Sequence, residues 1–583
     1  MGKTIFKTTQ YPIQTLINDI DHGKIALPDI QRPFVWNTTK VRDLFDSIYK
    51  GYPVGYLLFW ENVTDINRKD IGTDNKESTA KSLIIDGQQR LTALFATIKG
   101  IPIIDEDYKE KLIKIAFNPL QEKFEVTNVA TDRNVAYISD ISILFTNDFS
   151  EYRFVNEYIL KLKENQEVSP EDEEKISQNI THLRSILSYD FTILEISENV
   201  DEETVANIFV RVNSKGVILK QSDFVLTLLS VFWESGRKKL EEFSMQSNNS
   251  SNKNTHYSSF NHLIDVKPGE ILRAVVGYGF NRGRMSDVYT LLRGRDFTTR
   301  EYIESLKQQR FDELEQYVAN GLDNTTWHDY INLIQSLGFK HKDLITSRTN
   351  FFYSYAFYLI GKYKFKIEYH SLEKIIARWF VMSALKSRYS GSSESVFEGD
   401  LALIRNVTTG DEFITLLNER IDSEITNDFW EITMPILLTS SNAKNPQWLI
   451  FIASQIRNNN ELLFSSKKIA DLFDPVITTK KSRLDKHHIF PKNHLKSIGI
   501  NSQTDQNQIA NYIYLDYKTN ITISDESPTD YFHDFSKYSG ENISEVMQKH
   551  ALPERFYEME YQSFLESRRK LLARKLKDYF NSI

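Results

Sequence analysis

Two adjacent histidines and two later asparagines are the side chains of this sequence best suited to chemistry. His487 and His488 lead into an Ile-Phe-Pro segment. Asn511 and Asn520 follow them, nine residues apart. One imidazole and one side-chain oxygen can hold a divalent cation, while a second imidazole takes a proton from water. These parts suffice for metal-dependent hydrolysis of a phosphodiester.

A strand that carries both histidines should give them different tasks. Neighbouring side chains of an extended strand point to opposite faces of the sheet. We therefore expect one histidine to bind metal and the other to face the attacking water. His494 and His533 lie near enough in sequence to replace a metal ligand. The alternative for the pair is a polar cluster on the surface without chemistry.

The stretch from Leu484 to Asn520 resembles the HNH, or ββα-metal, nuclease motif. The resemblance implies that His487 is a metal ligand and that His488 is the general base. It also implies that Asn511 organises the hairpin loop and that Asn520 completes the metal site. Ligation by nitrogen and oxygen together does not favour Mg²⁺ alone, so Mn²⁺, Ni²⁺ or Zn²⁺ could serve.

Contact with DNA would have to come from local basic patches, because 71 basic residues against 79 acidic ones give a net charge of −8. The favoured patch surrounds the histidine pair, where a phosphate must dock: Lys480, Lys481, Arg483, Lys486 and Lys492. A second basic stretch holds Arg282, Arg284, Arg293, Arg295 and Arg300. A third is predicted on a C-terminal helix, where a solvated helix face is the alternative: Arg568, Arg569, Lys570, Arg574, Lys575 and Lys577.

A second candidate site is the segment Asp86-Gly87-Gln88-Gln89-Arg90, which lies between a predicted strand and a predicted helix. A glycine turn at the start of a helix exposes backbone N–H groups and the positive end of the helix dipole. Arg90 adds a cation, so the segment could bind a phosphate. The alternative is an ordinary turn. The sequence has no Walker A motif, which argues against a P-loop mechanism.

Three sequence blocks resemble the signature blocks of the GmrS-type N-terminal domain, which is related to the ParB/sulfiredoxin fold. They are LPDIQRPFVW (27–36), IIDGQQRLTAL (84–94) and FVRVNSKGVILKQSDF (209–224). The resemblance implies a nucleotide-binding centre that comprises Arg32, Asp86, Gly87, Gln88, Gln89, Arg90 and Asn213. The structural alternatives are an ion pair between Arg32 and Asp86 and an ordinary turn at Asn213.

The pattern of elements predicts an α+β multidomain protein. Apolar residues at helical spacing predict helices over 13–20, 41–48 and 91–98, and apolar runs predict strands over 24–27, 54–60 and 83–85. Residues 388–400 read as a connecting loop. Together with the resemblances, these elements suggest a GmrS/ParB-like nucleotide-binding and sensor domain (1–245), a helical linker domain (246–445), and an HNH endonuclease domain within helices (446–583).

The composition excludes several classes of protein. The sequence contains no cysteine, so disulfides and thiolate metal sites are excluded. No window is apolar enough to span a membrane, and the first residues do not form a secretory signal. We therefore expect a cytoplasmic protein without a membrane partner.

A GmrS-like domain followed by an HNH domain is the layout of single-chain GmrSD-type restriction endonucleases. The resemblance implies a modification-dependent (type IV) DNA endonuclease of bacterial anti-phage defence. Its partners would be double-stranded, modified phage DNA and a nucleoside triphosphate (NTP) whose binding or hydrolysis regulates cleavage. A homo-oligomer is compatible with this layout. Two alternatives stay open: a nucleotide-dependent DNA-binding switch with weak nuclease activity, and an NTPase that regulates a partner protein.

Overall fold

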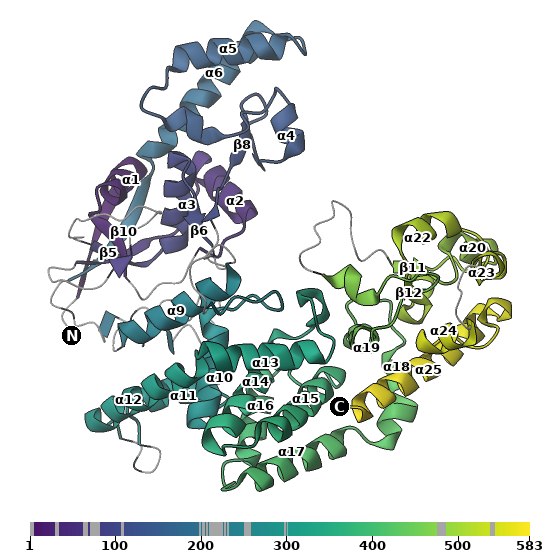
Figure 1. The fold of residues 1–583 in the computed structure, drawn as a ribbon. Coiled ribbons are helices and arrows are strands. Elements are labelled where there is room, and N and C mark those ends of the chain that lie inside the picture. Colours follow the sequence, from purple (N-terminus) through teal and green to yellow (C-terminus); the bar gives the residue numbers. More distant parts are fainter. Residues whose placement is uncertain are drawn as a thin grey trace. The chain divides into compact units, whose positions relative to one another are not determined.

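The computed structural model divides the chain into two compact units, Met1–Lys239 and Leu240–Ile583 (Figure 1). The division lies close to the predicted boundary at residue 245, and residues 246–445 and 446–583 fall within one unit. The predicted three-domain organisation stays a prediction. The structure describes residues 5–28, 34–61, 68–69, 82–105, 110–197, 200, 204–205, 208, 225–226, 229, 233–249, 258–296, 299, 301–474, 486–536 and 543–583.

A mixed six-stranded sheet forms the centre of the first unit. Its strand order is β1-β10-β3-β5-β2-β4. The pairs β10–β3 and β2–β5 are parallel, and the other three neighbouring pairs are antiparallel. The strands are β1 (Phe6–Pro12), β2 (Ile25–Pro28), β3 (Leu57–Glu61), β4 (Arg68–Lys69), β5 (Ser82–Asp86) and β10 (Asp190–Ile196).

Three amphipathic helices share one apolar core with this sheet. They are α1 (Ile13–Asp21), α2 (Thr38–Tyr49) and α3 (Gln88–Lys99). The apolar residues whose spacing predicted these helices are buried, so the three helix predictions are confirmed. Asn37 caps α2, because its side-chain oxygen accepts a hydrogen bond from the backbone N–H of Lys40 at 2.9 Å. The three predicted strands correspond to β2, β3 and β5, with bounds shifted by up to three residues.

Smaller elements complete the first unit. Two short hairpins pair β6 with β7 and β8 with β9, and helices α5 and α6 pack against each other. The elements are β6 (Ile103–Ile104), β7 (Glu110–Lys111), β8 (Ile115–Asn118), β9 (Lys123–Val126), α4 (Val129–Arg133), η1 (Ile141–Phe145), α5 (Glu151–Lys163), α6 (Pro170–Ser185) and η2 (Ile186–Ser188).

The second unit is mainly helical, which confirms the mixed α+β class with a helical C-terminal region. Its buried helices α14 and α15 pack on each other and on several neighbours. The elements up to residue 457 are α9 (Glu234–Asn248, which crosses the boundary), α10 (Pro268–Phe280), α11 (Met285–Leu292), α12 (Glu304–Gly321), α13 (Asn324–Ser336), η3 (Lys342–Leu344), α14 (Arg348–Leu359), η4 (Ile360–Lys364), α15 (Tyr369–Leu385), α16 (Ser393–Leu403), α17 (Gly410–Glu424), η5 (Phe429–Thr433), α18 (Met434–Leu437) and α19 (Pro446–Arg457).

The prediction of a loop over 388–400 is wrong for its second half, because helix α16 begins at Ser393. Phe397 of this helix is buried and stacks on Tyr353 of α14, with 3.8 Å between the ring centroids. The serines and glycine before the helix suggested a connector. Burial of an aromatic ring against a distant helix decides the conformation instead.

The last part of the chain contains a second, two-stranded sheet among short helices. The strands are β11 (Lys486–His488) and β12 (Tyr512–Tyr514). The remaining elements are η6 (Ile469–Phe473), α20 (Lys492–Ser497), α21 (Gln503–Gln506), η7 (Ile509–Asn511), α22 (Tyr517–Ile523), α23 (Pro528–Ser536), α24 (Ile543–Lys549), η8 (Phe556–Glu558) and α25 (Tyr561–Asn581). Across the described ranges, no helix combines the length and the apolar character that a membrane span requires.

Candidate functional site

The hairpin of β11 and β12, followed by α22, brings the predicted nuclease residues together. The strands are antiparallel, with His487 opposite Ile513 and His488 opposite Tyr512. Asn511 immediately precedes β12, and Asn520 lies on α22. His487 of β11 and Asn520 of α22, which are 33 positions apart in sequence, therefore meet.

His487 is directed towards α22, where its Nδ1 lies 2.9 Å from Oδ1 of Asn520. The side chain is buried, and burial lowers the pKa of His487 to about 4, against the opposing effect of the Asn520 hydrogen bond. The ring is therefore neutral at pH 7, which is the form that binds a metal ion. Its Nε2 is buried and has no hydrogen-bond partner among the described residues.

The contact between His487 and Asn520 fits a shared cation. The 2.9 Å between Nδ1 of His487 and Oδ1 of Asn520 is the length of a hydrogen bond, and it places an imidazole nitrogen beside an amide oxygen, two ligand types that suit a divalent cation. No group of three or more histidines, aspartates or glutamates suited to a metal occurs in the described ranges. A cation held here would take its remaining ligands from water and substrate.

His488 contacts a different part of the hairpin. Its Nε2 lies 3.0 Å from Oδ1 of Asn507, in the connection between β11 and β12. The edge of its ring meets Tyr512, with 5.1 Å between the centroids. The two histidines thus have different partners, as expected for neighbours on a strand, while their catalytic roles stay predictions. Asn507 was not among the predicted residues, and no local pattern distinguishes it from the polar residues around it.

Asn511 joins the two ends of the connection between the strands. Its side chain is fully buried. Oδ1 accepts a hydrogen bond from the backbone N–H of Phe490 at 2.8 Å, and Nδ2 donates to the carbonyl groups of Phe490 and Gln506. All three contacts are with backbone, so the side chain is suited to bracing the loop rather than to binding substrate.

Arg568 of helix α25 supports the outer edge of β12. Its Nη1 donates to the carbonyl oxygens of Ala510 (2.7 Å) and Tyr512 (2.8 Å). Successive carbonyl groups of an extended chain point to opposite sides, and that of Asn511 accepts from the N–H of Ile489 instead. Arg568 therefore satisfies the two carbonyls that the partner strand cannot reach.

The expectation of a solvated or DNA-binding face is wrong for two of the basic residues of α25. Arg568 is completely buried, and burial lowers its pKa to about 9. Arg569 is also buried and donates to Oε1 of Gln508 at 2.9 Å. Lys570 is exposed. The three form one unbroken run in sequence, and only the packing of α25 separates them.

The predicted DNA-binding patch is only partly within the described residues. Lys480, Lys481 and Arg483 lie outside them, as does the side chain of Lys486, whose backbone begins β11. Lys492 begins α20 and is exposed.

The two histidines that could replace a metal ligand, His494 and His533, lie against aromatic rings. His494 packs against Phe490, with 6.2 Å between the ring centroids. His533 lies 5.8 Å from Tyr557 by the same measure. Their role as substitute metal ligands stays a prediction.

The second basic stretch is partly paired within its own unit. Arg282 contacts Glu398 through Nη1 at 3.1 Å. The guanidinium of Arg293 lies 5.2 Å from the ring centroid of Tyr302. Arg300 lies outside the described residues. These contacts give the stretch a structural task in addition to any role in binding DNA.

In the first unit, Asp86 to Arg90 forms a turn between β5 and α3. Asp86 ends the strand, and Gly87 precedes the helix with φ of 92°, where a Cβ atom would lie 2.3 Å from the side chain of Leu57. Gln88 and Gln89 are buried. Oε1 of Gln89 accepts from the N–H of Val35 at 2.8 Å.

Arg90 is directed back towards the segment that precedes β3. Its Nη1 donates to the carbonyl oxygen of Val54 at 2.6 Å, and its Nη2 lies 3.6 Å from the Asp86 carboxylate. Burial lowers the pKa of Arg90, against the opposing effect of Asp86. Arg32 and Asn213 lie outside the described residues. The nucleotide-binding role of the block stays a prediction, and Arg90 also holds the turn together.

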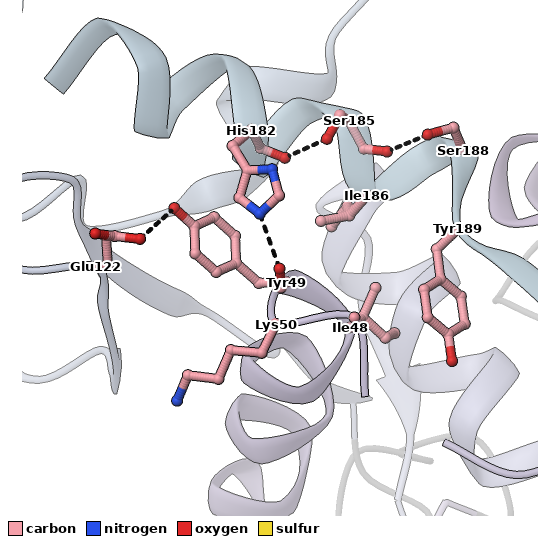
Figure 2. Close-up of a pocket in the computed structure, with 10 residues that line it drawn as sticks. Ile48, Tyr49, Lys50, Glu122, His182, Ser185, Ile186, Ser188 and Tyr189 are labelled. Carbon is pink, nitrogen blue, oxygen red and sulfur yellow. Dashed lines mark hydrogen bonds between the residues drawn. The ribbon is translucent and has the colours of Figure 1, made fainter. Parts of the chain in front are cut away.

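A separate cavity of about 460 Å³ lies in the first unit between the end of α2 and the region of α6 and η2 (Figure 2). Nε2 of His182 lies 2.9 Å from the carbonyl oxygen of Tyr49, whose hydroxyl donates to Glu122 at 3.4 Å. These polar groups therefore bond to one another across the wall of the cavity. None of its lining residues was predicted as a site residue.

Comparison with known proteins agrees with the predicted N-terminal resemblance. Residues 13–230 match the model of the family described as "GmrSD restriction endonuclease, N-terminal domain". This region includes the turn from Asp86 to Arg90, and it ends before the histidine pair. An N-terminal region of the GmrSD type is thus supported.

A full-length relative extends the comparison beyond this region. An uncharacterized protein of Methanocaldococcus jannaschii is 23% identical over an alignment of 613 positions, which covers 96% of this chain and 97% of the relative. The similarity therefore runs through both compact units.

Proposed function

We propose that the protein is a metal-dependent DNA endonuclease whose nuclease centre lies in the second unit. The observation that carries the proposal is the contact between His487 of β11 and Asn520 of α22, with His488 next to His487 on the same strand and Asn511 bracing the connection between β11 and β12. The N-terminal match supports DNA as substrate and defence against phage as the setting, because the matched family is described as a restriction endonuclease.

The proposed reaction is hydrolysis of one phosphodiester bond. His488 takes a proton from water, which then attacks phosphorus, and the 3′-oxygen leaves. His487 and Asn520 hold a divalent cation, which would supply positive charge for the transition state and the leaving oxygen. Mg²⁺, Mn²⁺, Ni²⁺ and Zn²⁺ are the candidates. The exposed Lys492 stands five residues from His487, where it could contact the DNA backbone.

We also propose that an NTP binds at Gly87–Arg90 and regulates cleavage of modified DNA. The N-terminus of α3 supports this idea, because its first backbone N–H groups point away from the helix body with the positive end of the dipole. The NTP could act by binding alone or by hydrolysis.

A cleavage assay tests the proposal and separates it from its alternatives. Modified and unmodified phage DNA would be incubated with the pure full-length chain, with each metal ion and with or without each NTP. The proposal requires chelator-sensitive cleavage of the modified DNA. Salt-dependent binding without cleavage would favour the DNA-binding switch. NTP hydrolysis without cleavage or DNA binding would favour the regulator of a partner protein.

Metal titration should distinguish the two asparagines. We expect His487→Ala and Asn520→Ala to weaken metal affinity, so that cleavage partly returns at higher Mn²⁺ concentration. Asn511→Ala should not respond, because its side chain bonds to the backbone groups that hold the loop. Cleavage rates over a Mn²⁺ series would measure this. Equal recovery of Asn511→Ala would show that it is not simply a brace.

Nucleotide titration should detect the proposed coupling between the two sites. We expect Arg90→Ala to lower NTP affinity, measured by calorimetry, while metal affinity at His487 stays unchanged. Thermal melting should accompany the titration, because Arg90 also bonds to Val54. In the unaltered protein, modified DNA must change NTP affinity by the same factor by which NTP changes DNA affinity. NTP affinity that is identical with and without modified DNA would show that the two sites are not coupled.

A further inference from the structure

We propose that Asn507 is the positioning residue for His488, a role that rests on the proposed nuclease function. Asn507 follows the short helix α21 and is half-buried. Its Oδ1 lies 3.0 Å from Nε2 of His488, across a sequence separation of 19 residues. This contact joins the proposed base directly to the connection between the two strands.

The chemistry of this contact decides which ring nitrogen carries the proton. An amide oxygen can only accept a hydrogen bond, so Nε2 of His488 must donate one. A neutral imidazole carries a single N–H, and its other nitrogen then holds the lone pair. The geometry therefore assigns proton acceptance to Nδ1. It also limits rotation of the ring about its bond to the strand.

The segment that carries Asn507 is firmly held. The neighbouring side chains of Gln506 and Gln508 are both buried. Gln506 donates to the carbonyl oxygen of Ile500 at 2.7 Å, and Gln508 accepts from Arg569 at 2.9 Å. The backbone N–H of Asn507 itself donates to the carbonyl oxygen of Gln503. The acceptor is thus placed before substrate binds, which is the condition under which a partner can orient a catalytic group.

Asn507 and Asn511 have separate tasks in the same connection. Asn511 bonds to the backbone of Phe490 and Gln506. Asn507 instead contacts the side chain of His488. Loss of the Asn511 side chain should loosen the loop as a whole. Loss of the Asn507 side chain should leave the loop in place and allow the His488 ring to rotate.

The experiment compares two replacements of Asn507 of similar size in the full-length chain. Asn507→Leu removes the acceptor, and Asn507→Asp keeps an oxygen in the same place. The comparison uses mildly alkaline buffer, so that the carboxylate introduced by Asn507→Asp does not keep the His488 ring protonated. Under these conditions Asn507→Leu should lower kcat by about 100-fold. KM for DNA and metal affinity should stay near their unaltered values. Asn507→Asp should recover most of kcat.

Nuclear magnetic resonance of chain with ¹⁵N-labelled histidine supplies a readout that needs no cleavage. The signals of His488 are identified by their loss in His488→Gln. They should show a proton on Nε2 in the unaltered protein and in Asn507→Asp, and a mixture of tautomers in Asn507→Leu. The control is Asn501→Leu, because the side chain of Asn501 is exposed and makes a long contact of 3.5 Å with the carbonyl of Gly499, away from His488. It should change neither kcat nor the ring signals.

The outcomes separate the two proposals. Normal kcat in Asn507→Leu, or a proton on Nδ1 of His488 in the unaltered protein, would overturn the positioning role. Absence of cleavage by the unaltered protein on every DNA would overturn the proposed function instead. The ring signals would then still show whether Asn507 sets the position of the proton.

Discussion

Replacement of His488 by alanine is expected to lower DNA cleavage by about 10²–10⁴-fold, the usual contribution of a general base. The effect should fall on the chemical step, because the base acts on water in the transition state and does not hold the DNA. His488 is only partly buried, so the fold should survive its loss. Single-turnover cleavage measures the rate, and fluorescence anisotropy measures the binding of labelled DNA.

Two further variants make this result specific. His370→Ala removes a histidine of α15 whose side chain is 90% exposed, and it should cleave normally. His487→Ala should regain activity with added Mn²⁺, whereas His488→Ala should not. If His488→Ala is the variant that Mn²⁺ rescues, the roles of the two histidines are exchanged. Full activity in His488→Ala would remove the nuclease assignment of this motif.

Replacement of Arg568 by alanine should weaken the hairpin by about 3 kcal/mol or more. The carbonyl groups of Ala510 and Tyr512 would lose their donor, and each buried, unsatisfied group costs about 1–3 kcal/mol. The lost side chain also leaves a cavity, because Arg568 is completely buried. Hydrogen–deuterium exchange of peptides that cover 509–516 should accelerate by about 100-fold, since each tenfold change corresponds to about 1.4 kcal/mol.

The neighbouring Lys570 supplies the control for Arg568. Its side chain is exposed on the same helix, so Lys570→Ala should leave the exchange of β12 unchanged. Unchanged exchange in Arg568→Ala would mean that the two carbonyls find other donors. We would then no longer regard α25 as the support of the hairpin.

Helices of the first unit were predictable because their sequence pattern and their burial agree. Apolar residues of α1 at 13, 16, 17 and 20 are all buried. Helix α16 was missed for the opposite reason, because the serines and glycine before it suggest a connector. Its place is decided by Phe397, which stacks on Tyr353 of another helix. A contact between side chains that are far apart in sequence cannot be recognised from the local sequence pattern.

The candidate site likewise contains residues that the sequence pattern indicates and residues that only the packing of the chain reveals. His487, His488, Asn511 and Asn520 could be selected from the sequence because their residue types and spacing resemble a known motif, and their roles stay predictions. The partners of this motif were not predictable. Arg568 reaches Ala510 across 58 residues, and a run of three basic residues reads as solvated until the packing of α25 is known. Asn507 likewise can be recognised only in the folded chain, where its side chain contacts His488.

The support of β12 by α25 has a consequence for the order in which the protein becomes active during synthesis. When the ribosome has completed both strands of the hairpin, Arg568 is still to be made, because α25 begins 47 residues after Tyr514. The two outer carbonyls then have no donor, and the hairpin should be loose. A nascent chain that already carries all four motif residues should thus be a poor nuclease.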